Sequence, residues 1–351
     1  MNLACSVPFK TVPFAFVSLL AAASLFVSSE ALAQNDQVFV DGSNKPQRGS
    51  VAAITKDGVQ LKAGANTKAI PAGNISKIIF TGDPSELTKA RTFAIDGQYE
   101  QALEELEKID ASKLKPNAKA EAAFYMMQAK AKMALAGRGN KAKAVQQAMG
   151  FVSANRNSYH FYDSAKILGD LALSMNNHPQ ALKFYGSLAS SKSIETKIES
   201  VYLGAVTKLK QGETSKALAD FEKISGMKAD TTGKKRLQTL AQAGKAVGMA
   251  KSGKGKEGLA LVKQLIAKLN PTDVEMSARI YNAQGDCYVA TGDVDGAIMA
   301  YLHTHLMFST QADAHAEALS NLVPLWEKAG RPDRVAEARQ ELQQRYPGFG
   351  K

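Results

Sequence analysis

The stretch YNAQGDCYVATGDVDGAIMAY, residues 281–301, spaces its small and bulky residues as two packed helices require. Apolar residues recur three and four positions apart on both sides of Gly292, which is typical of helices with one buried face. Gly292 tolerates the left-handed conformation that ends a helix. Ala297 suits a close helix crossing, because a larger side chain would force the backbones apart. The stretch therefore predicts a helix, a tight turn and a second helix.

The same pattern recurs along most of the chain. The segments GQYEQALEELEKI (97–109), NNHPQALKFYGSL (176–188), QGETSKALADFEKI (211–224) and AGRPDRVAEARQEL (329–342) align with residues 291–304. The residue at the close crossing recurs every 36 to 42 positions, at Ala102, Ala144, Ala181, Ala217, Gly258, Ala297 and Val335. We expect the turns at Gly97, Gly139, Asn176, Gly212, Gly253, Gly292 and Gly330. A bulky residue follows four positions after the crossing at Leu106, Tyr185, Phe221 and Tyr301, whereas two units have Ala148 and Val262 there.

This pattern resembles the tetratricopeptide repeat (TPR) family. Gly285 and Tyr288 match the small and aromatic positions of that family's first helix. Gly292, Ala297 and Tyr301 match the turn, the close crossing and the bulky position of its second helix. The units here are longer than the family's period of about 34 residues. Pro324 falls inside the first helix of the last unit, where it should produce a kink. The resemblance implies a mainly α solenoid of about seven helix pairs over residues 84–351.

The resemblance also implies a concave groove lined by the first helix of each pair, which in related arrays takes an extended or helical peptide. In the repeat frame, the residues expected to face this groove are Lys166, Asp170, Tyr202, Val206, Lys210, Val247 and Lys251. The set of Lys, Asn and Arg residues that would clamp a C-terminal carboxylate is not found at the matching positions. Recognition of a C-terminal tail is therefore not predicted.

Residues 34–83 have a different texture. The β-prone runs QVFV, RGSVAAIT, GVQLKA, TKAIPA and SKIIF are separated by glycines and by Asp-Gly pairs, as turns require. Five short strands bury little surface as an open sheet, so we expect a small rolled barrel whose closure hides the edges. This rhythm resembles the SH3-like or Sm-like small barrels.

Residues 1–33 read as an export signal. Lys10 precedes the apolar run FAFVSLLAAASLFV, and the segment ends in small residues at the positions that signal peptidase reads. We expect cleavage between Ala33 and Gln34 and a periplasmic or extracellular location. An uncleaved membrane anchor is the alternative, but the run is short for a span of about 20 residues. Cys5 precedes the run, so no lipid anchor is predicted, and Cys287 alone cannot form an intramolecular disulfide.

The charge of the chain is uneven. The net charge is +11, yet residues 111–270 hold 27 Lys and Arg against 10 Asp and Glu. The densest basic stretch, residues 228–258, includes Lys234, Lys235, Arg236, Lys245, Lys254 and Lys256. One interpretation is solvated lysine that keeps an array soluble. The other is an electropositive surface that attracts an acidic partner. Aromatic residues do not interleave with this stretch, so nucleic acid is not expected.

Chemistry is not indicated elsewhere. GKGKEG (253–258) matches a dinucleotide-binding pattern, but it follows a predicted helix rather than a strand. GMAKSGKG (248–255) approaches a P-loop, but Gly255 stands where Ser or Thr should bind magnesium. His303, His305, Asp313 and His315 could form a weak metal site, although partly exposed helical histidines are the favoured interpretation, and we expect no metal. Cys287 reads as a buried thiol and Trp326 as a core residue. No cofactor is expected.

Three functions remain open. The favoured one is a non-enzymatic scaffold of the bacterial cell envelope that binds another protein or peptide in the groove. The alternative is a binder of an anionic envelope polymer through the basic middle repeats. An enzyme is the third, and no residue supports it.

Overall fold

The structure is a computed structural model that describes residues 35–43, 45–270, 272–347 and 349. These residues all belong to one compact unit, Asn35–Lys351. The predicted export signal and its cleavage site at Ala33 lie outside the described residues. No helix in the described part of the chain combines the length and the apolar character needed to cross a membrane.

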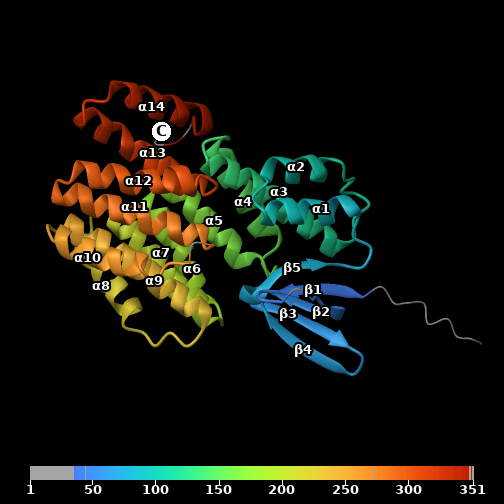
Figure 1. The fold of residues 1–351 in the computed structure, drawn as a ribbon. Helices are drawn as coiled ribbons and strands as arrows, with labels where there is room; N and C mark the ends of the chain where they lie inside the picture. The colour runs from blue at the N-terminus through green and yellow to red at the C-terminus, as the bar shows by residue number, and fades with distance from the viewer. Residues whose placement is uncertain (1–34, 44, 271, 348, 350–351) are drawn as a thin grey trace, which may run out of the picture. The chain divides into compact units, whose positions relative to one another are not determined.

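The five predicted strands are confirmed as one small antiparallel sheet (Figure 1). The strands are β1 (Asp36–Val40), β2 (Gln47–Thr55), β3 (Gly58–Ala63), β4 (Asn66–Pro71) and β5 (Ile75–Ile79), and a 3-10 turn, η1 (Ala72–Asn74), joins the last two. The strand order is β4-β3-β2-β1-β5, so β4 and β5 are the two edges. The expected closure of the barrel is therefore wrong in one respect, because no ladder joins these two strands. Lys68 and Pro71 on β4 blunt an edge that would otherwise pair with another strand.

The sheet has a small core that includes a residue from the helical part of the chain. Val38, Ile78 and the three apolar residues of β3 and β4 that face inward are buried together with Tyr159. Asp57, in the β2–β3 turn, accepts hydrogen bonds from the hydroxyl of Tyr162 at 3.2 Å and from the backbone N–H of Lys192 at 3.0 Å. The sheet therefore packs against the third helix pair as well as preceding the first.

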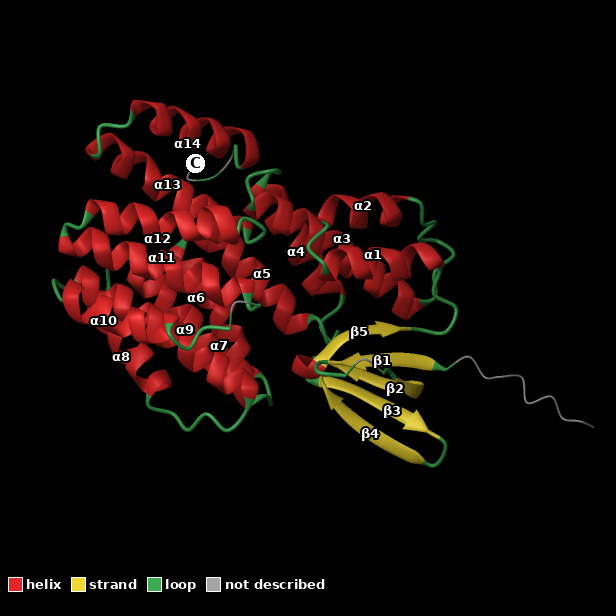
Figure 2. Ribbon diagram, viewed as in Figure 1, coloured by secondary structure: helices red, strands yellow, loops and turns green. Residues whose placement is uncertain are grey.

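The chain after the sheet forms the predicted helix pairs (Figure 2). The described helices are α1 (Ser85–Ile95), α2 (Tyr99–Glu107), α3 (Pro116–Leu135), α4 (Lys141–Ala154), α5 (Phe161–Ser174), α6 (His178–Ser187), α7 (Ile194–Lys210), α8 (Thr214–Ser225), α9 (Thr232–Lys251), α10 (Gly255–Ile266), α11 (Val274–Thr291), α12 (Val294–Met307), α13 (Ala312–Lys328) and α14 (Pro332–Arg345). A 3-10 turn, η2 (Leu188–Ser190), follows α6. Helix α13 contains Pro324 in its interior, and Trp326 on the same helix is partly buried against the core around Tyr301.

Six of the seven predicted turn residues have the left-handed backbone that ends the first helix of a pair. The exception is Gly139. The second unit instead turns at Gly137, with a φ of 77°, and the N–H of Arg138 bonds to the carbonyl of Met133 at 2.8 Å. The prediction failed because α3 ends two residues earlier than the alignment of the crossings implies. The same pair of backbone bonds closes each of the seven helices, which is the Schellman arrangement.

The crossing positions are buried, as predicted. The six small residues among them are enclosed by neighbouring helices, and Val335 is 7% exposed. The two tyrosines among the bulky residues four positions later cover glycines on the partner helix. A Cβ atom on Gly285 would lie 2.5 Å from the ring of Tyr301, and one on Gly169 would lie 2.2 Å from the ring of Tyr185. The spacing in residues 281–301 therefore follows from a tyrosine ring that packs against a glycine.

A buried ionic cluster joins the first, second and third helix pairs. Glu121 on α3 accepts a hydrogen bond from Arg91 Nε on α1 at 3.2 Å, and its other oxygen lies 3.0 Å from His160 Nε2. Arg91 also pairs with Asp83 at 2.7 Å. Arg91, Glu121 and His160 are each less than 5% exposed.

The last helix pair contacts the second. Ala136, which caps the C-terminus of α3, is buried in one cluster with Ala316 and Leu319 of α13, Ala338 of α14, and Tyr346. Residues about 200 positions apart in sequence thus share one small core. A stack in which each pair touched only its neighbours would not contain this contact.

Candidate interaction face on the first helices

The residues predicted to line the groove lie on three consecutive first helices. Lys166 and Asp170 are on α5, Tyr202, Val206 and Lys210 on α7, and Val247 and Lys251 on α9. Within each helix they are four residues apart, which places them on one face. All seven side chains retain some exposure to solvent, as a binding surface requires.

Lys166 and Asp170 are held by neighbouring helices. Lys166 Nζ lies 2.5 Å from Glu199 Oε1 on α7. Burial alone would lower the pKa of Lys166, but the charges of Glu199 and Asp170 outweigh it and raise the pKa. Asp170 accepts a hydrogen bond from the hydroxyl of Tyr185 at 2.7 Å, and its second oxygen lies 4.0 Å from Lys132 on α3. These contacts form a line of charges of alternating sign across α3, α5 and α7.

A second line of charges crosses α9, α11 and α13. Arg236 on α9 bonds to Glu275 on α11 at 2.6 Å, and Arg279 bonds to the same carboxylate at 3.3 Å. Arg279 then reaches Asp313 on α13 at 3.0 Å. Each of these ion pairs is partly exposed, so each contributes only about 0–1 kcal/mol to stability.

Tyr202 lies within the electrostatic influence of both lines. Burial raises the pKa of its hydroxyl, and the charges that act on it come from Arg279, Glu275, Lys166 and Arg236. Those four residues belong to α11, α5 and α9, so both lines contribute charges near Tyr202. We call the surface formed by Lys132, Lys166, Asp170, Glu199, Tyr202, Arg236, Glu275, Arg279 and Asp313 the inner face.

The sequence analysis did not predict Glu199, Glu275, Arg279 or Asp313 as groove residues. Each lies 18 or 22 positions before the crossing residue of its own unit, whereas the predicted groove residues lie 7 to 15 positions before it. Those positions continue the same helix face by one to two turns. Extending the repeat frame toward the start of each first helix would have found all four.

Lys210 and Lys251 lie near a buried carboxylate. Burial raises the pKa of Asp286 on α11 to about 6, Glu317 adds to this effect, and a hydrogen bond from Tyr301 together with Lys251 and Lys210 opposes it. The Tyr301 hydroxyl donates to Asp286 at 2.6 Å. Asp286 therefore bonds to the tyrosine of its own pair and interacts electrostatically with basic residues of the two preceding pairs.

The six residues of the predicted basic patch do not gather in one place. Lys234 pairs with Asp230 at 2.7 Å, Lys245 with Glu222 at 2.9 Å, and Arg236 belongs to the inner face. The remaining three are exposed, with Lys235 in the first turn of α9 and Lys254 and Lys256 beyond its C-terminal end. A helix of twenty residues is about 30 Å long, so α9 separates these two groups.

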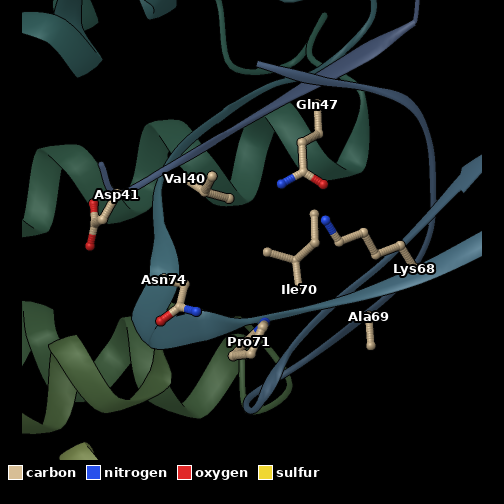
Figure 3. Close-up of a pocket in the computed structure, with 8 residues that line it drawn as sticks. All are labelled: Val40, Asp41, Gln47, Lys68, Ala69, Ile70, Pro71 and Asn74. Carbon is tan, nitrogen blue, oxygen red and sulfur yellow. The ribbon is translucent and has the colours of Figure 1, made fainter. Parts of the chain in front are cut away.

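The sheet has a pocket of about 300 Å³ beside its edge strand β4 (Figure 3). Its lining residues come from the edge strand β4, from the ends of β1 and β2, and from η1. Gln47, Lys68 and Ile70 point toward one another across the pocket, whereas Ala69 points away from its centre. The sequence analysis placed no functional residue here, because an open edge was not expected.

The other residues considered for chemistry have structural roles. Cys287 is fully buried, and burial, with a smaller effect of Asp286, raises the pKa of its thiol to about 12, so it is not a nucleophile at neutral pH. Gly253 forms a turn with a φ of 80°, and a Cβ on Gly258 would lie 2.6 Å from the carbonyl oxygen of Ala246. The phosphate-binding interpretation of GKGKEG is therefore replaced by a turn and a helix crossing.

The histidines are separated by the structure into two groups. His303 stacks on Tyr281, and its Nδ1 lies 2.8 Å from the carbonyl oxygen of Met299. Asp313 belongs to the inner face. His305 and His315 lie together with Glu341 of α14, which the sequence analysis did not associate with them.

Comparisons with known proteins support the fold and leave the function open. No protein-family model matches the chain, and no curated protein matches it. Among solved structures, a Rap protein complexed with competence and sporulation factor has a TM-score of 0.51 and 13% identity, over 75% of this chain and 76% of that one. A tetratricopeptide repeat protein from Parabacteroides merdae has a TM-score of 0.49 and 15% identity, over 76% of this chain and 93% of that one.

The fold is thus a TPR-like helix-pair solenoid preceded by a small five-stranded antiparallel sheet. The class follows from the repeated helix pairs, their turns and their buried crossings.

Proposed function

We propose that the protein is a non-enzymatic interaction scaffold of the bacterial cell envelope that holds a partner protein or peptide on its inner face. The observation that carries this proposal is the position of Tyr202, which is partly exposed, packs with Val206 and Val247 and lies near charges from three other helices. Val206 and Val247 continue an apolar strip beside it. Such a surface offers apolar area for affinity and paired charges for selectivity.

The ion pairs of the inner face suit exchange with a partner. Because each exposed pair contributes little to stability, a partner with its own charges can replace one member at small cost. Burial of the apolar strip contributes about 25 cal/mol for each Å² removed from water. We therefore expect a partner segment that places an apolar side chain on Tyr202 and charged side chains on either side of it.

Two further observations support the proposal. The neighbour with a TM-score of 0.51 is in complex with a second molecule, competence and sporulation factor. Residues 1–33 have the pattern of an export signal, which would deliver the protein to the envelope.

The experiment is a capture of partners from envelope extract on the chain that begins at Gln34, followed by elution with a salt gradient. The doubly substituted variant Tyr202→Ala, Val206→Ala removes the apolar strip without changing the charge. We expect a defined protein that resists high salt on the unsubstituted chain and is lost on this variant. The control is Lys235→Ala, Lys256→Ala, which changes exposed residues away from the inner face and should leave capture unchanged. Equal capture on both variants would refute the inner-face proposal.

A second candidate is a binder of an anionic envelope polymer, favoured by the excess of basic residues between positions 111 and 270. This function predicts binding that weakens steeply as ionic strength rises, since exposed charges are screened within about 10 Å at 0.1 M salt. It also predicts that Lys235→Ala, Lys256→Ala weakens binding while the apolar variant does not. The two variants therefore separate the candidates by giving opposite results.

A further inference from the structure

Three side chains from the last three helices converge at one point. His305 is near the end of α12, His315 near the start of α13, and Glu341 in α14. His305 Nδ1 lies 2.8 Å from His315 Nε2, and each histidine has a ring nitrogen 3.8 Å from an oxygen of Glu341. One potential ligand atom from each residue lies within 4.8 Å of the other two.

Tyr346 orients the buried histidine. Its hydroxyl oxygen lies 2.6 Å from His315 Nδ1. A neutral imidazole carries one N–H, so when Nδ1–H donates to Tyr346, Nε2 presents its lone pair to His305 and Glu341. A hydrogen bond of this kind to the remote ring nitrogen is how proteins orient a metal-binding histidine. His315 is fully buried.

We propose that His305, His315 and Glu341 bind a divalent transition-metal ion, and that zinc fits this donor set best. Two imidazole nitrogens and one carboxylate oxygen are borderline ligands that zinc accepts in tetrahedral geometry. The fourth position is left for water or for a donor from another molecule.

The required movements are small. Tetrahedral ligands with zinc bonds of about 2.0–2.1 Å lie roughly 3.3 Å apart. His305 Nδ1 and His315 Nε2 lie 2.8 Å apart and must separate by about half an ångström. Glu341 Oε1 lies 3.8 Å from His315 Nε2 and must approach it by a similar distance. Both changes are within reach of side-chain rotation, because Glu341 and His305 are partly exposed.

Arg345 is the group that opposes the metal. It lies 2.9 Å from Glu341 Oε1, so its positive charge repels a cation and occupies one carboxylate oxygen. Without Arg345, this oxygen would be free to act as the ligand, 3.8 Å from His315 Nε2. Replacing Arg345 should therefore tighten metal binding, which is a result that a merely structural histidine pair would not give.

Metal binding would also act on the contact between the last and second helix pairs. Tyr346 belongs both to the hydrogen bond with His315 and to the buried cluster that contains Ala136. A bound ion would connect α12, α13 and α14 beneath that cluster, so it should stabilise the folded chain by mass action.

The test is calorimetric titration of zinc into the chain that begins at Gln34 after treatment with a chelator, together with thermal melting. We expect one zinc ion per chain and a rise of several degrees in the melting temperature. His305→Gln and Glu341→Gln should each weaken binding at least tenfold, and Arg345→Gln should strengthen it several-fold. His303→Gln, two residues before His305 on the same helix and stacked on Tyr281, should leave binding unchanged. Circular dichroism checks that every variant is folded.

Absence of saturable binding at zinc concentrations up to about 100 µM would overturn the proposal, because a built metal site binds more tightly than that. Equal affinity in His305→Gln, Glu341→Gln and the unsubstituted chain would overturn it as well. Loss of binding in Cys287→Ser, with His305→Gln unaffected, would assign the metal to the thiol instead.

Discussion

At the residue scale, the buried cluster of Arg91, Glu121 and His160 was beyond reach of the sequence analysis. Its bonds join residues 30 and 39 positions apart, and no short-range pattern connects them. The turn and crossing residues were predictable because each answers a local demand, either a left-handed backbone or a lack of space. Gly139 was misassigned because two glycines lie close together, and only the end of α3 decides that Gly137 forms the turn.

Glu121→Gln should destabilise the protein strongly. The substitution leaves the Arg91 guanidinium and His160 with less compensation in a buried site, and removing one member of a buried ion pair costs about 3–5 kcal/mol. Urea denaturation measures this loss as a fall in the free energy of unfolding. Glu104→Gln, which changes an exposed carboxylate on α2, is the matched control and should shift the free energy by no more than about 0.5 kcal/mol. Similar small effects for both substitutions would contradict this role of Glu121.

The pH dependence of the free energy of unfolding should reflect the ion pair of Glu121 and His160. Burial alone would raise the pKa of Glu121, but His160 and Arg91 outweigh it and lower the pKa below its usual 4.5. Burial alone would lower the pKa of His160, but Glu121 outweighs it and raises the pKa above its usual 6.5. The contribution of Glu121 is therefore lost as pH falls below 4.5, and that of His160 is lost as pH rises through its raised value.

The free energy of unfolding, measured from pH 3 to pH 9, should thus favour the unsubstituted chain over Glu121→Gln most between about pH 4.5 and 6.5. If the difference in free energy of unfolding between the two chains stays constant from pH 3 to pH 9, Glu121 and His160 do not titrate as described.

At the element scale, the helix pair is the unit that the sequence analysis predicted best. Its spacing follows from close contacts within about 20 residues, such as Tyr301 against Gly285. The five strands were also found, since each is a short β-prone run between turns. Closure of the barrel was not predictable, because it depends on whether β4 and β5 reach each other in space. No ladder joins them, and the pocket of Figure 3 lies beside the edge strand β4.

Ala297→Leu should test the crossing of α11 and α12. Ala297 is fully buried, so three additional carbon atoms overpack the contact and cost about 1–3 kcal/mol. Differential scanning calorimetry should show a lower melting temperature. Met299→Leu on the same helix changes a side chain that is 57% exposed and should have little effect. An unchanged melting temperature for Ala297→Leu would contradict the repeat frame itself.

At the scale of the whole molecule, the inner face arises from helices that are distant in sequence. The repeat frame placed Lys166, Tyr202 and Val247 on first helices, and the structure agrees with these positions. It did not show that charges on α11 act on a tyrosine of α7, since this depends on how successive pairs rotate relative to one another. The excess of basic charge was readable from composition, but its distribution around α9 was not.

The measurement that tests the central claim most directly is photo-crosslinking in intact cells. A photoreactive phenylalanine analogue is placed at Val247, beside Tyr202 on the inner face, or at Met299, an exposed position on a second helix. Our account predicts one defined crosslinked protein from position 247 that disappears when Tyr202→Ala, Val206→Ala is added, and no such product from position 299. A defined product from position 299 alone would place the partner elsewhere and contradict the account.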